Sequence, residues 1–234
     1  MSTDEPRTAL SRPLAEAKAL GSPMIVRGIL GVVFGLATVF WPRDSANPTH
    51  LTVGVDVVDL LSIGYLVLFA LALVYQALRA PLTVRTAMLG QAVITIPAIV
   101  FLFLADQPAE ARAALSIWAL LHGVLEYLNY RGLKSQPMAS DFLISAGCHG
   151  LLGVILIAGD DFEALAILGF AGAAALIAGV IFIIGGYSRL SRAKQVTAVG
   201  GDTDGGATTD SAADGGPTPD TPDTHRAPRP EEDD

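Results

Sequence analysis

The chain has 234 residues, of which 51% are hydrophobic and only 16% are charged, and its mean hydropathy is +0.49. Apolar residues in this proportion cannot all be buried in the core of a soluble protein of this size, so the composition excludes a soluble globule and predicts a membrane protein. The net charge of -8 falls entirely on residues 195–234, and the single cysteine, Cys148, excludes an intrachain disulfide.

Six apolar stretches follow a polar N-terminal segment, residues 1–23, which we expect on the cytoplasmic side. Each stretch is about as long as the ~20 residues that an α-helix needs to cross the hydrocarbon core. The stretches cover residues 24–41, 57–78, 86–104, 113–130, 142–158 and 164–187. Their regular spacing predicts an all-α polytopic protein with six transmembrane helices arranged as three repeated helical hairpins within residues 24–190.

The last 40 residues have a different composition, rich in Gly, Thr, Pro, Asp and Ala. Residues 195–234 contain ten acidic side chains and two arginines, with almost no large apolar side chain. Such a segment buries too little surface to offset the entropy lost on ordering it. We therefore expect a disordered acidic tail, for which the sequence names no partner.

The distribution of lysine and arginine predicts the orientation, because positively charged loops are retained in the cytoplasm. Eleven basic residues before the tail, Arg27 among them, fall in segments that would share one side of the membrane, whereas only Arg43 and Arg112 fall on the other. Both termini should therefore be cytoplasmic. The outer loops are acidic, and three pairs there have the spacing of helix caps, which is our interpretation of them. The pairs are Asp56 with Asp59, Gln107 with Glu110, and Asp160 with Glu163.

Small residues recur within the spans at spacings that let helix backbones approach closely in lipid. This pattern predicts tight helix packing and leaves a homo-oligomer open. The residues are Gly28, Gly31 and Gly35 in the first helix, Gly147, Gly150 and Gly153 in the fifth, and Ala175 and Gly179 in the sixth. Pro97, central in the third helix, lacks a backbone donor and should kink it, although membrane helices also tolerate proline.

Ionisable residues within the spans indicate a candidate functional site, because charge at membrane depth is costly. His122 and Glu126 are four residues apart on one face of the fourth helix, where the pair could share a proton. Gln91 and His149 could extend them into an intramembrane polar cluster. The alternative is structural: Glu126 reaches headgroup water or Arg131 near the inner boundary, and His122 is a hydrogen-bonded core residue.

Motifs for other functions are missing from the sequence. It contains no HExxH, GxSxG, P-loop or Rossmann glycine pattern, so we expect no enzymatic activity and no cofactor. A metal site needs at least three convergent ligands, and the cluster offers only two histidines and one glutamate. Basic residues do not cluster with aromatic ones, which argues against nucleic-acid binding. The expected partner is the lipid bilayer.

Residues 27–42, RGILGVVFGLATVFWP, resemble the opening repeat of the HdeD-like family of short-repeat bacterial membrane proteins. The resemblance extends over the three-hairpin plan, with Gly90 and Gly147 in places comparable to Gly28, whereas the acidic tail departs from it. It implies a six-helix protein of the bacterial inner membrane without a catalytic site, some of whose relatives are linked to acid resistance. Two functions follow as hypotheses: support of acid or envelope stress tolerance, and a small proton-coupled transporter or channel with polar residues between the hairpins.

Overall fold

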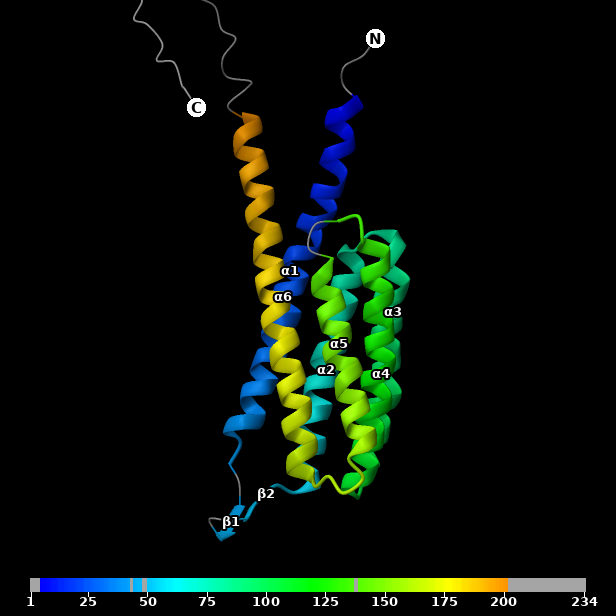
Figure 1. The fold of residues 1–234 in the computed structure, drawn as a ribbon, viewed down its shortest axis with the longest axis vertical. Helices are drawn as coiled ribbons and strands as arrows, with labels where there is room; N and C mark the ends of the chain where they lie inside the picture. The colour runs from blue at the N-terminus through cyan, green and yellow to red at the C-terminus, as the bar shows by residue number, and fades with distance from the viewer. Residues whose placement is uncertain (1–4, 43, 48–49, 137–138, 202–234) are drawn as a thin grey trace, which may run out of the picture.

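The computed structural model describes residues 5–42, 44–47, 50–136 and 139–201, which form a bundle of six helices and one short two-stranded ribbon (Figure 1). The helices are α1 (Glu5–Phe40), α2 (Val55–Arg79), α3 (Leu82–Phe103), α4 (Pro108–Leu133), α5 (Ser140–Ala158) and α6 (Ala164–Gly201). The ribbon consists of β1 (Asp44–Asn47) and β2 (His50–Thr52), which pair antiparallel between α1 and α2. It was not predicted from the sequence.

Five of the six described helices are long and apolar enough to cross a membrane. They provide the spans Lys18–Phe40, Val55–Arg79, Leu82–Phe103, Ser140–Ala158 and Ala164–Gln195. The remaining helix, α4, has 26 residues but carries His122, Glu126 and Asn129, whose polar side chains lower its hydropathy. All three are fully buried inside the bundle. The prediction of a polytopic all-α membrane protein is confirmed.

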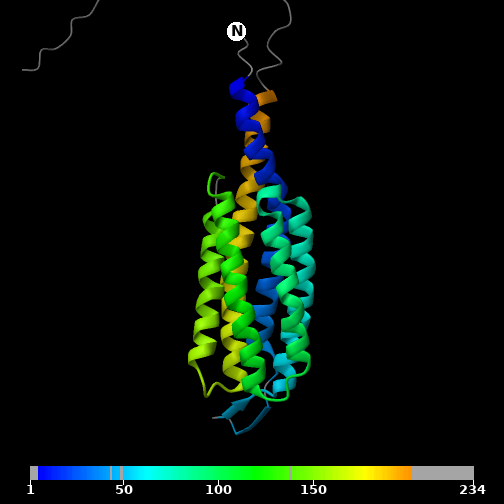
Figure 2. The same ribbon diagram turned by 90° about the vertical axis from the view of Figure 1, so that its right-hand side faces the viewer.

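Each helix contacts its neighbour in sequence, and α6 closes the bundle against α1 (Figures 1 and 2). We call the end that carries the ribbon and residues 104–107 and 159–163 the loop end, and the opposite end the terminal end. The start of α1 and the end of α6 both extend beyond the other helices at the terminal end (Figure 1). The most extensive helix contacts join α1 to α6, rather than the two members of a predicted hairpin.

Small residues allow α1 and α6 to lie this close. A Cβ atom added to Gly28 would lie 2.6 Å from the carbonyl oxygen of Gly179, and one added to Gly31 would lie 2.6 Å from that of Ala175. Gly35 approaches Gly172 in the same way, at 2.7 Å. A side chain at these positions would force the two backbones apart, so glycine is required there.

The glycines of α5 differ from one another. Gly153 packs against α4, since an added Cβ would lie 2.6 Å from Leu120. A Cβ on Gly147 or Gly150 would meet nothing within 4 Å, so neither position needs glycine to avoid a clash. Gly150 contributes only its backbone, against which Gly123 packs: a Cβ on Gly123 would lie 3.0 Å from the Gly150 nitrogen. Gly123 was not among the predicted packing residues, although Ala119 precedes it by four residues on α4.

The ends of several helices depart from the sequence predictions. α1 is already helical at Glu5 and α6 continues to Gly201, so parts of the predicted N-terminal segment and of residues 195–234 are helical. Ala, Leu, Lys and Arg in both flanks favour helix, which extends each element past its apolar part. Residues 202–234, where disorder was expected, lie outside the described residues. α3 runs unbroken through Pro97, and the kink stays a prediction.

Helix capping follows the predicted pattern at one of three places. Gln107 and Glu110 form a capping box at the start of α4, with Glu110 Oε2 accepting a 3.2 Å hydrogen bond from the Gln107 backbone. α2 instead begins after Gly54 without a side-chain cap, so the expected role of Asp56 is wrong. At α6 the backbone carbonyl of Glu163 accepts the first helical bonds, which puts the helix start three residues beyond Asp160.

Candidate functional site

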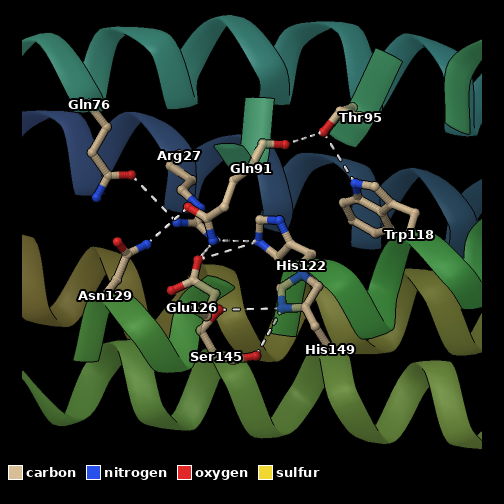
Figure 3. Close-up of polar contacts among 10 residues, drawn as sticks. All are labelled: Arg27, Gln76, Gln91, Thr95, Trp118, His122, Glu126, Asn129, Ser145 and His149. Carbon is tan, nitrogen blue, oxygen red and sulfur yellow. Dashed lines mark hydrogen bonds and ion pairs between the residues drawn. The ribbon is translucent and has the colours of Figure 1, made fainter. Parts of the chain in front are cut away.

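An ion pair between Arg27 of α1 and Glu126 of α4 lies at the centre of the bundle (Figure 3). Arg27 is 2% exposed and Glu126 is fully buried. The guanidinium also approaches two further side chains: Arg27 Nη2 lies 3.0 Å from His122 Nε2, and Nη1 donates to Gln76 Oε1 at 3.5 Å. Buried charges in proteins are paired and hydrogen-bonded in this manner, because an isolated charge would be very costly.

His122 connects this ion pair to the polar side chain of α3. Its Nε2 atom lies 3.3 Å from Glu126 Oε1, one turn along α4, and 3.5 Å from Gln91 Nε2. Gln91 in turn accepts a 3.1 Å hydrogen bond from Asn129 Nδ2 through its Oε1 atom. Three of the four residues predicted from the sequence therefore meet directly inside the bundle.

His149, the fourth predicted residue, joins through its ring rather than through a charged partner. Its ring centroid lies 4.6 Å from that of His122, and its Nδ1 atom lies 2.9 Å from the Ser145 carbonyl oxygen on the same helix (Figure 3). Trp118 stacks on His122, with centroids 5.2 Å apart, and donates its indole N–H to Thr95 Oγ1 at 3.2 Å. Aromatic rings thus cover the polar groups on the side toward the loop end.

Aromatic side chains also surround the guanidinium of Arg27. Its Cζ atom lies 4.8 Å from the ring centroid of Phe69 on α2 and 4.3 Å from that of Phe182 on α6. Cation–π contacts of this kind stabilise a cation that has left water. With these two rings, all six helices contribute a side chain to the cluster around the Arg27–Glu126 ion pair.

No family model, curated protein or solved structure matches this chain. The likeness of residues 27–42 to the HdeD-like family therefore stays a prediction.

The structure corrects two interpretations of single residues. Glu126 reaches neither Arg131 nor water, since it is fully buried and pairs with Arg27. Arg27 was counted among the charges that fix the orientation, because it lies only three residues into the predicted span. The span begins at Lys18 instead, which places Arg27 well inside it. The sequence does contain a signal for this pair. Arg27 precedes a long charge-free stretch, and Glu126 is an acidic residue within a predicted span, so each could have been proposed as the other's partner.

Several polar atoms of the cluster have no partner among the described residues. These atoms are Arg27 Nε, His122 Nδ1 and Glu126 Oε2. Buried groups without a partner generally indicate bound water, an ion or a functional role. No three His, Cys, Asp or Glu side chains in the described part of the chain converge in a way that could hold a metal ion. The arrangement can hold and exchange protons, since an imidazole and a carboxylate lie within 3.3 Å of each other.

Proposed function

We propose that this membrane protein is a non-enzymatic protein of the HdeD-like type that supports tolerance of acid or envelope stress. The observation that carries the proposal is the Arg27–Glu126 ion pair, buried among side chains from all six helices. A proton taken up by Glu126 removes the counter-charge of Arg27 while both stay buried. Because an unpaired buried charge is strongly destabilising, protonation changes how tightly the helices are held together.

The proposed location is a bacterial inner membrane, with the loop end outside and both termini in the cytoplasm. Two observations support this orientation. The start of α1 and the end of α6 both lie at the terminal end of the bundle (Figure 1). With Arg27 removed from the count, ten basic residues before the tail remain on the terminal side, against Arg43 and Arg112 on the other.

Cysteine labelling tests the orientation, since Cys148 is the single native cysteine. In a Cys148→Ser background, an impermeant maleimide added to intact cells should label Asp160→Cys at the loop end and leave Lys134→Cys at the terminal end unlabelled until the cells are opened. Both residues are exposed. The reverse pattern would overturn the orientation.

Complementation of a deletion strain tests the stress role. Wild-type protein should restore survival at low external pH, and Glu126→Gln, which cannot change charge, should not. Glu110→Gln is the matched control, because it makes the same change in an exposed capping glutamate. The amount of protein in the membrane is measured for each variant, so that loss of folding is recognised. Normal survival of the deletion strain, or full rescue by Glu126→Gln at equal abundance, would refute the proposal.

A second candidate function is a small proton-coupled transporter. The observation that favours it is that four polar side chains contact one another in the interior of the bundle and not at its lipid-facing surface: Gln91, His122, Glu126 and His149. Transport predicts a proton flux in proteoliposomes that Glu126→Gln abolishes and Glu110→Gln leaves intact. A wild-type protein that carries no proton or coupled solute would remove this candidate.

A further inference from the structure

The guanidinium of Arg27 uses two of its three nitrogens in the contacts of the cluster. Nη1 donates to Gln76, and Nη2 contacts both His122 and Glu126. The third nitrogen, Nε, is buried and has no hydrogen-bond partner among the residues that the structure describes. A buried donor without a partner is costly, so a partner from outside the protein is expected at this atom.

A small cavity borders Arg27 between α1, α2, α5 and α6. Its volume is about 10 Å³, and the polar residues in its lining are Arg27, Tyr65 and His149. Phe69 and Phe182, whose rings contact the guanidinium, form part of its apolar wall. Four small residues complete the wall: Gly31, Ala175, Ala178 and Gly179. A site for one water needs roughly 10–15 Å³ of accessible space, so the cavity has room for a single water.

The contacts of His149 determine which of its ring nitrogens carries the proton. Nδ1 lies 2.9 Å from the Ser145 carbonyl oxygen and 3.4 Å from the Ser145 hydroxyl (Figure 3). Because a carbonyl oxygen can only accept a hydrogen bond, Nδ1 must be the donor. In a neutral imidazole the other nitrogen, Nε2, is then an acceptor. His149 therefore supplies the cavity with a side chain that can accept a hydrogen bond.

The three polar groups offer a water the donors and the acceptor that it needs. Arg27 Nε can only donate, the Tyr65 hydroxyl can donate, and His149 Nε2 accepts, so one water makes three hydrogen bonds there, the usual number for a buried water. The phenol and the imidazole each interact electrostatically with both Arg27 and Glu126. An anion would fit the site poorly, because Glu126 already neutralises the charge of Arg27.

We propose that this cavity binds one water molecule, which accepts hydrogen bonds from Arg27 Nε and the Tyr65 hydroxyl and donates one to His149 Nε2. The water joins α2 and α5 to the ion pair that α1 and α4 form. Tyr65 and His149 are then positioning residues, which act through the water to hold the guanidinium against Glu126. The assignment goes beyond the stress role and does not depend on it, because it concerns how the buried charge of Arg27 is satisfied.

Solid-state NMR of the full chain in lipid bilayers tests the site, with ¹⁵N-arginine, ¹⁵N-histidine and ¹³C-glutamate as labels. Arg27 is recognised by the dipolar coupling of its guanidinium to the Glu126 carboxylate, which also reports that the ion pair is intact. The first readout is a cross-peak between the Arg27 Nε–H proton and water, and the second is the position of the proton on His149. Tyr65→Phe removes one partner of the water, and Tyr187→Phe makes the same change at an exposed position of α6.

The parent protein should show the water cross-peak at Arg27 Nε–H and a His149 ring protonated at Nδ1. The cross-peak should weaken by about twofold to tenfold in Tyr65→Phe, since the water loses one of its three hydrogen bonds, and should be unchanged in Tyr187→Phe.

Four results would each overturn the proposal: no water cross-peak in the parent, a contact of Arg27 Nε with the Glu126 carboxylate in its place, a His149 proton on Nε2, or equal cross-peaks in the two variants. If Tyr65→Phe does not fold, the two signals of the parent still decide. A deletion strain without acid sensitivity, together with these signals, would refute the stress role and leave the water site standing.

Discussion

Replacing Arg27 with methionine should be among the most destabilising single changes in this protein. The substitution keeps an unbranched side chain of similar length between Phe69 and Phe182, so the loss is mainly one of charge. It leaves Glu126 fully buried without its cationic partner. Glu126→Gln produces the reverse situation, an arginine that is 2% exposed and has lost its counter-charge.

The magnitude follows from the burial of both partners. Removing one member of a buried ion pair costs about 3–5 kcal/mol, because the remaining charge is uncompensated and solvent cannot screen it. The fraction of unfolded protein should then rise by about a hundredfold or more, since each ~1.4 kcal/mol is a factor of ten. In the double variant Arg27→Met with Glu126→Gln neither charge remains, so its stability should return to within about 2 kcal/mol of the parent.

Reversible unfolding in mixed micelles, followed by circular dichroism, measures the free energy of unfolding of all four proteins. The cycle gives a coupling energy between the two sites, which should be large and favourable in the parent. Glu110→Gln, an exposed control, should change the free energy by no more than about 1 kcal/mol, because glutamine keeps an acceptor for the Gln107 N–H and only the charge at the helix start is lost. Single variants within about 1 kcal/mol of the parent, or a double variant as unstable as the sum of the two, would refute the assignment of Arg27 and Glu126 as a buried pair.

Four further substitutions, one of them a control, probe the rest of the bundle by the same unfolding measurement. Gly28→Val should destabilise the protein by about 3 kcal/mol or prevent folding, because its Cβ would lie 2.6 Å from the Gly179 oxygen. Gly147→Ala, the control, should leave the stability unchanged. Equal effects of the two substitutions would contradict the α1–α6 packing. Thr95→Val should cost about 1–2 kcal/mol by leaving the Trp118 N–H without its acceptor, and a blue shift of Trp118 emission should accompany it; an unchanged spectrum would count against this hydrogen bond. Arg112→Ala should cost about 1 kcal/mol, since Arg112 Nη1 donates to the Leu156 carbonyl at 2.9 Å near the end of α5; no change in stability would show that this contact is negligible.

The number and type of helices could be predicted from the sequence because length and hydropathy determine them. The polarity of α4 was also visible, and it led to His122 and Glu126 four residues apart. The sequence alone did not identify Arg27 as the partner of Glu126. Arg27 lies 99 residues before Glu126, and only the packing of α1 into the bundle brings the two together.

The same limit explains the remaining differences. Glycine spacing on one helix identifies small residues but not the helix that faces them, so Gly147 was included and Gly123 was missed. Helix ends beyond the apolar spans depend on local propensity, which hydropathy does not measure, and α1 and α6 are both longer than the spans suggested.

Solid-state NMR in lipid bilayers tests most directly whether Arg27 and Glu126 form an ion pair inside the membrane-spanning bundle. Protein labelled with ¹⁵N-arginine and ¹³C-glutamate should show dipolar coupling between one guanidinium and one side-chain carboxylate that is lost in both Arg27→Met and Glu126→Gln. The signal should be insensitive to a water-soluble paramagnetic relaxation agent, because Arg27 is 2% exposed and Glu126 is fully buried. Absence of the coupling, or strong relaxation of the Glu126 carboxylate by the agent, would contradict the account.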